Sequence, residues 1–161
     1  MAYGLFLSGS KLVTVFDFGG GTLDVSLMSI QDGRFEVLGI GGDTNLGGED
    51  INNVLVDHLL ELLYKHHDVV KAQVAGLDMV RLRREVEKAK IQLSQEEHAD
   101  IEVDDIAGVK KFTYTLMRRK FEQLCDPIWK KYVQMPSNVV LLSISIDNLV
   151  YTGVFGSFPV C

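Results

Sequence analysis

The chain has 161 residues and a net charge of −6, and its hydrophobic content of 47% permits a globular core. This length suits one domain or two small lobes, and the negative charge argues against a protein that binds nucleic acid in bulk. Two cysteines do not form a disulfide framework, and the longest apolar run, residues 139–146, is too short to cross a membrane. No secretory signal is visible. We therefore expect a cytoplasmic protein with no membrane or nucleic-acid partner.

A glycine-rich loop lies between two predicted strands near the start of the chain. Residues 12–16 form an apolar run typical of a buried strand, and alternating apolar residues predict a second strand over 23–30. The loop between them contains three consecutive glycines, flanked by Asp17 and Thr22. No helix follows the glycines and no Gly-Lys-Ser/Thr is present, so this is neither a dinucleotide fingerprint nor a Walker loop.

The residues of this loop have the chemistry that a metal-bound phosphate needs. Glycines allow backbone amides to approach phosphate oxygens, Asp17 offers a hard oxygen ligand for Mg²⁺, and Thr22 adds a small hydroxyl. The alternative is an ordinary hairpin turn, although three consecutive glycines are more than a turn requires.

A second glycine-rich loop, residues 41–48, follows a predicted hairpin and a third strand. Asp32 and Gly33 predict the tight turn, residues 35–40 the strand, and residues 49–66 an amphipathic helix with acidic residues in its first turn. Gly47 and Gly48 precede the amide end of this helix. They suit either an anion or close backbone packing, and the sequence leaves both interpretations open.

A second helix is predicted over residues 79–93, with a buried face that repeats every three or four positions. A neighbouring face has four residues that could contact one ligand together: Glu87, Lys90, Ile91 and Ser94. Their spacing alone favours a solvated face with a weak Glu87–Lys90 ion pair. Strands are predicted over 100–103 and 111–116, a third helix over 118–132, and apolar strands over 139–146 and 149–156.

Three motifs in sequence order resemble the seventy-kilodalton heat-shock chaperones. Residues 16–26 resemble their second phosphate loop, residues 42–50 the next signature, and residues 82–90 their adenosine-contacting helix. The likeness runs from residue 1 to about residue 132 and implies the second lobe of an actin-like ATPase domain. The implied fold is α/β with a mixed sheet, restricted to lobe II and incomplete at the C-terminus.

The resemblance also implies a division of the chain into four parts. Residues 1–11 would be a remnant of the hinge between the two lobes, and residues 12–48 a sheet subdomain with the phosphate loop. Residues 49–116 would be a helical and hairpin tip, and residues 117–161 would return to the sheet subdomain.

The same resemblance implies an ATP or ADP site with Mg²⁺. Asp17 would hold Mg²⁺, through water, and would act in catalysis with Thr22 beside the γ-phosphate. The backbone would bind the rest of the phosphate and sugar region, through Gly19, Gly20, Gly21 and Gly48. Adenosine would contact Glu87, Lys90, Ile91 and Ser94. Gly153 would also belong to the nucleotide site, and Val154 adds a side chain where the family lets adenosine approach bare backbone.

The function implied is ATP-dependent protein folding in the stress response, with ATP hydrolysis by the complete ATPase domain. The family's first lobe, with its catalytic lysine, and its peptide-binding domain have no counterpart in this sequence, so we expect the chain alone to hydrolyse ATP negligibly. One alternative is a non-catalytic module that binds nucleotide-exchange factors or co-chaperones through residues 49–116. Another is a sugar kinase of the same superfamily, which the match over 82–90 disfavours.

Overall fold

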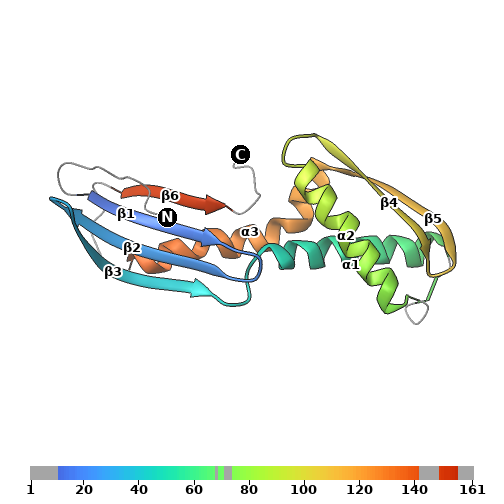
Figure 1. Ribbon diagram of the computed structural model, residues 1–161, viewed down its shortest axis with the longest axis horizontal. Coiled ribbons are helices and arrows are strands. Elements are labelled where there is room, and N and C mark those ends of the chain that lie inside the picture. Colours follow the sequence, from blue (N-terminus) through green and yellow to red (C-terminus); the bar gives the residue numbers. More distant parts are fainter. Residues whose placement is uncertain (1–10, 68, 71–73, 142–148, 156–161) are drawn as a thin grey trace. The chain divides into compact units, whose positions relative to one another are not determined.

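The computed structural model describes residues 11–67, 69–70, 74–141 and 149–155 (Figure 1). Contacts divide these residues into two compact units. The first contains the described residues among 1–48 and 128–156, and the second contains those among 49–127.

The first unit is built on a four-stranded mixed sheet of order β3-β2-β1-β6. Its strands are β1 (Lys11–Phe18), β2 (Leu23–Gln31), β3 (Arg34–Asp43) and β6 (Leu149–Phe155). β2 runs antiparallel to both β1 and β3, whereas β6 runs parallel to β1. Asp32 and Gly33 form the predicted turn with φ of 47° and 80°, the left-handed backbone that tight hairpins require.

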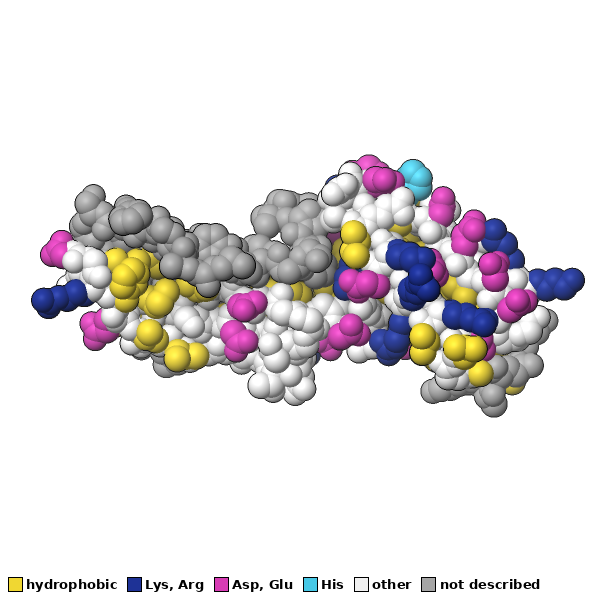
Figure 2. Space-filling model, in the orientation of Figure 1, with side chains coloured by type: hydrophobic (Ala, Val, Ile, Leu, Met, Phe, Trp, Pro, Cys, Tyr) yellow, Lys and Arg dark blue, Asp and Glu magenta, His cyan; other side chains and the backbone are white. Residues whose placement is uncertain are grey.

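Aromatic packing fixes helix α3 (Arg118–Leu141) against one face of this sheet. The ring of Tyr132 meets that of Phe18 edge-on at 5.4 Å and that of Phe16 at 6.1 Å. The edge strand β3, in contrast, exposes several apolar side chains, and hydrophobic side chains gather over the sheet in Figure 2. The exposed fractions are 64% for Phe35 and 76% for Ile40.

The second unit contains α1 (Gly48–His67, whose first residue belongs to the first unit), α2 (Gly76–Gln92), and the hairpin of β4 (His98–Ile106) and β5 (Val109–Met117). The first part of α3 completes it. Its core contains apolar residues at the helical spacing that the sequence indicated, among them Leu55, Leu59, Leu82 and Val86, together with Ile101 of β4 and Leu116 of β5. Cys125 is fully buried, and burial raises the pKa of its thiol to about 12, so the thiol stays protonated.

Two helix boundaries differ from the sequence prediction. α2 begins at Gly76, three residues early, because the buried Asp78 carboxylate accepts hydrogen bonds from the amides of Ala75 (3.1 Å) and Ala107 (3.3 Å). This tertiary contact caps the helix where local propensity alone does not.

The predicted strand over residues 139–146 is wrong where the structure describes it. α3 continues through Pro127 and Pro136 to Leu141, and residues 142–148 lie outside the described residues. The prediction rested on the apolar, strand-like run that follows Pro136, although a proline also disfavours helix in the residue before it and removes one hydrogen bond. Trp129 and Tyr132, which pack on Phe18, lie between the two prolines and within the helix that the sequence predicted.

Candidate functional site

The first glycine loop forms a reverse turn, and two of its backbone amides are available to a ligand. The amide of Gly19 donates a hydrogen bond to the carbonyl of Thr22 at 2.8 Å, and Gly20 and Gly21 are exposed at the tip. Within the part of the chain that the structure describes, the amides of Gly20 and Gly21 form no hydrogen bond. The turn therefore exposes two adjacent donors, the arrangement that binds phosphate oxygens.

The second glycine loop packs directly against the first. The amide of Gly48 donates to the carbonyl of Gly19 at 3.0 Å, and both Gly47 and Gly48 are buried. A Cβ on Gly47 would lie 2.6 Å from the carbonyl group of Gly20 and from the amide nitrogen of Gly21. Gly47 thus serves close packing, and the Gly48 amide is already engaged by the first loop.

Gly20 and Gly21 differ from Gly47 in what the fold demands of them. A Cβ at either position would meet no described atom within 4 Å, and neither residue has the left-handed backbone that favours glycine. The described fold would therefore accept alanine at both positions. Their lack of side chains leaves open space in front of the two free amides.

Two carboxylates lie side by side at the start of this loop. The β1–β2 register places Asp17 directly opposite Asp24, both exposed, and the hydroxyl of Thr22 donates to Asp24 Oδ2 at 3.3 Å. Like charges in opposed positions repel each other, and a hard cation relieves that repulsion. Asp24 was missed from the sequence because its partnership with Asp17 depends on the hairpin register.

The backbone of β6 runs beside the same strand. Its register pairs Gly153 with Phe16 and Val154 with Asp17. The predicted site residue Gly153 therefore belongs to the same sheet as the first glycine loop.

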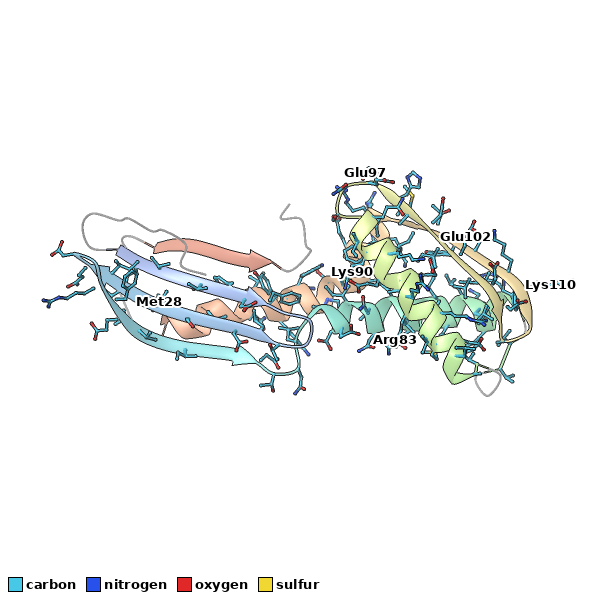
Figure 3. All side chains as sticks on the ribbon, in the orientation of Figure 1. Met28, Arg83, Lys90, Glu97, Glu102 and Lys110 are labelled. Atoms are coloured by element: carbon cyan, nitrogen blue, oxygen red, sulfur yellow. The ribbon has the colours of Figure 1, made fainter. Side chains whose placement is uncertain are left out.

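In the second unit, the predicted face of α2 contains a tight ion pair. Lys90 Nζ lies 2.6 Å from Glu87 Oε2, and Lys90 is only 7% exposed (Figure 3). Burial by itself would raise the pKa of Glu87, but hydrogen bonds from Lys90 and from Asn52, with the charge of Lys90, outweigh it and lower the pKa. Sequence reasoning missed Asn52, which donates to Glu87 Oε2 at 2.8 Å from α1.

The two remaining residues of this face lie closer to solvent. Ile91 is 48% exposed, and Ser94 follows the end of α2, where its hydroxyl donates to the carbonyl of Ile91. Glu87 and Lys90 are therefore in contact, whereas Ile91 and Ser94 form a separate local pair. All four belong to the second unit.

Comparison with known proteins identifies the class to which this fold and these loops belong. The family model described as Hsp70 protein matches residues 1–147. The chain is 40% identical over 163 residues to the heat shock cognate 70 kDa protein 3 of Dictyostelium discoideum, an alignment that covers 95% of this chain and 25% of the relative. The chain therefore belongs to the Hsp70 family.

Family membership confirms several predictions made from the motifs. The chain corresponds to part of the ATPase domain of a heat-shock chaperone, with the mixed α/β fold of the actin-like type. The chain spans 25% of the length of this relative. No helix among the described residues is long and apolar enough to cross a membrane.

The different roles of Gly47 and Gly20 lead to a stability prediction. Replacing Gly47 with alanine should lower the free energy of unfolding by about 1–3 kcal/mol, because the added Cβ meets backbone that cannot yield without moving the loop. Gly20→Ala should change it by less than about 1 kcal/mol, and reduced freedom of the unfolded chain favours a small gain. Urea unfolding followed by circular dichroism measures both. Equal losses in the two variants would contradict the packing described here.

Proposed function

We propose that the chain binds MgATP or MgADP, with the first glycine loop holding the phosphates. The observation that supports this most directly is the pair of exposed amides at Gly20 and Gly21, which bond to no described residue and have no described atom where a Cβ would be. Phosphoryl transfer depends chiefly on positioning and on electrostatic stabilisation of the phosphates, which such donors supply. Gly19 would support the same turn, and Gly48 would lie near the sugar and phosphate.

Asp17 and Thr22 are proposed to act at the terminal phosphate. Asp17 would hold Mg²⁺ through water, and the exposed Asp17–Asp24 pair has the oxygen donors that this ion prefers. Bound Mg²⁺ would neutralise charge on the phosphates. Thr22 would place its hydroxyl beside the γ-phosphate, a role that requires it to leave Asp24, its present acceptor.

Adenosine is proposed to contact the α2 face of the second unit, and Gly153, in the first unit, is proposed to bind nucleotide through its backbone. Glu87 and Lys90 offer an acceptor and a donor held together, and the exposed side chain of Ile91 offers an apolar surface for the base. Ser94 would use its hydroxyl oxygen as an acceptor, since its proton is donated to Ile91.

The binding proposal is tested by calorimetric titration of Mg-ADP into the purified chain. The wild-type chain should bind saturably, and Asp17→Ala should abolish or strongly weaken binding because it removes the oxygen ligand proposed for the Mg²⁺ shell. Glu36→Ala is the matched control, since it removes an exposed carboxylate of β3. Absence of binding by a wild-type chain that circular dichroism shows to be folded would refute the proposal.

Catalysis by this polypeptide alone should be negligible. The described residues near the first glycine loop supply amides, carboxylates and a hydroxyl, whereas the family's catalytic lysine belongs to the first lobe. We expect ATP hydrolysis to appear only when a separately produced first lobe of a relative is added. Steady phosphate release that tracks the purified chain alone and disappears in Asp17→Ala would contradict this expectation.

A second candidate function is a docking surface on the second unit for nucleotide-exchange factors or co-chaperones. Leu77 and Val80 of α2 are 61% and 63% exposed, and Lys and Arg side chains gather over α2 in Figure 2. Apolar side chains among cations suit a partner with an apolar, acidic surface. The docking function would be the better supported of the two if the folded chain failed to bind Mg-ADP.

A cytoplasmic location stays a prediction. The first lobe and the peptide-binding domain also stay predicted partners.

A further inference from the structure

We infer that Asn52 is a positioning residue, which holds the carboxylate of Glu87 in the orientation that receives a hydrogen-bond donor of the nucleotide. This inference rests on the proposed nucleotide-binding function. It concerns a residue of α1 that lies outside both glycine loops and outside the α2 motif.

The side-chain amide of Asn52 has a fixed orientation. Asn52 is 4% exposed, and its Nδ2 donates to Glu87 Oε2 at 2.8 Å and to Glu49 Oε1 at 3.2 Å. Ionised carboxylates only accept hydrogen bonds, so the nitrogen, rather than the oxygen, of the amide must face them.

This orientation leaves the other end of the amide unsatisfied. Asn52 Oδ1 is buried and accepts no hydrogen bond from the residues that the structure describes. A buried acceptor without a donor destabilises a fold, and an apolar side chain of similar shape would avoid the penalty. Stability alone therefore gives a poor account of an asparagine at this position, and the amide's contact with Glu87 offers a better one.

Glu87 is held through one oxygen and leaves the other available. Both Lys90 Nζ and Asn52 Nδ2 contact Oε2, while no described residue donates to Oε1. The Glu87 side chain is 42% exposed, so a ligand can reach it. Two donors on a single oxygen fix the plane of the carboxylate and direct Oε1 toward a ligand. The hydroxyls of a ribose and the amino group of adenine are donors of the required kind.

The competing explanation for Asn52 is that it joins α1 to α2 and so stabilises the fold. A neighbouring contact already joins these two helices. Arg83 of α2 donates to Asn53 Oδ1 at 2.8 Å and lies 3.6 Å from Glu49 Oε2 (Figure 3). Asn53 is exposed, and within the described part of the chain its side chain bonds to Arg83 and not to Glu87. Asn53→Ala is therefore a matched control that removes a contact between the same two helices and leaves the Glu87 carboxylate in place.

The experiment compares Asn52→Leu and Asn53→Ala with the wild-type chain in two measurements. Calorimetric titration of Mg-ADP gives the Kd, and urea unfolding gives the stability. Asn52→Leu should raise the Kd by about tenfold, the effect of one hydrogen bond to a charged group, with an unchanged or higher unfolding midpoint. Asn53→Ala should leave the Kd unchanged. A carbon-detected NMR titration should also show a higher pKa for Glu87 in Asn52→Leu than in wild type.

The outcomes separate this inference from the binding proposal. If the wild-type chain binds Mg-ADP and Asn52→Leu binds equally well, Asn52 is merely structural and the inference is wrong. An unchanged pKa of Glu87 in Asn52→Leu would overturn it too, because the amide would then not hold the carboxylate. If the folded wild-type chain does not bind, the binding proposal fails first and this inference falls with it.

Discussion

The close contact of Gly47 with the Gly20–Gly21 peptide is the constraint on which the first glycine loop depends. Only a residue without a side chain fits against that peptide, and the Gly48 amide then bonds to the Gly19 carbonyl. The second loop thereby bonds to one side of the first loop, while the amides of Gly20 and Gly21 have no partner among the described residues. The second glycine motif thus acts as a support that shapes the first, at the point where α1 begins.

The residues proposed to bind nucleotide include polar groups that have no hydrogen-bond partner, or that lie beside a like charge, among the described residues. In the first unit these are the two glycine amides and the opposed carboxylates of Asp17 and Asp24. In the second unit they are the open oxygen of Glu87 and the buried Oδ1 of Asn52. The buried Oδ1 of Asn52 and the opposed carboxylates are unfavourable for folding, since buried polar groups need partners and like charges repel. Under the proposed function, the phosphates would supply acceptors for the glycine amides and Mg²⁺ would offset the charge of the opposed carboxylates.

Local patterns in the sequence predicted most of the elements, whereas contacts between elements decided the rest. Alternation and turn chemistry identified β1, β2 and the Asp32–Gly33 hairpin, and family motifs confirmed the fold class. The end of α3 was missed because the helix continues past Pro136, and the start of α2 because the Asp78 carboxylate at that start accepts a hydrogen bond from Ala107 of the β4–β5 turn. Asp24 and Asn52 were missed for a related reason. Asp24 matters because the strand register places it opposite Asp17, and Asn52 matters because it bonds to Glu87 on another helix. Neither contact can be predicted from the spacing of residues in the sequence.

The most direct test of this account is the response of individual backbone amides to the ligand. Two-dimensional amide NMR spectra of the isotope-labelled chain, recorded during titration with Mg-ADP, report on each glycine separately. The account predicts large, saturable shifts at Gly20 and Gly21, since their free amides would acquire phosphate oxygens as acceptors. Binding of Mg-ADP that leaves both of these amide signals in place would contradict it, because the phosphates would then be held elsewhere.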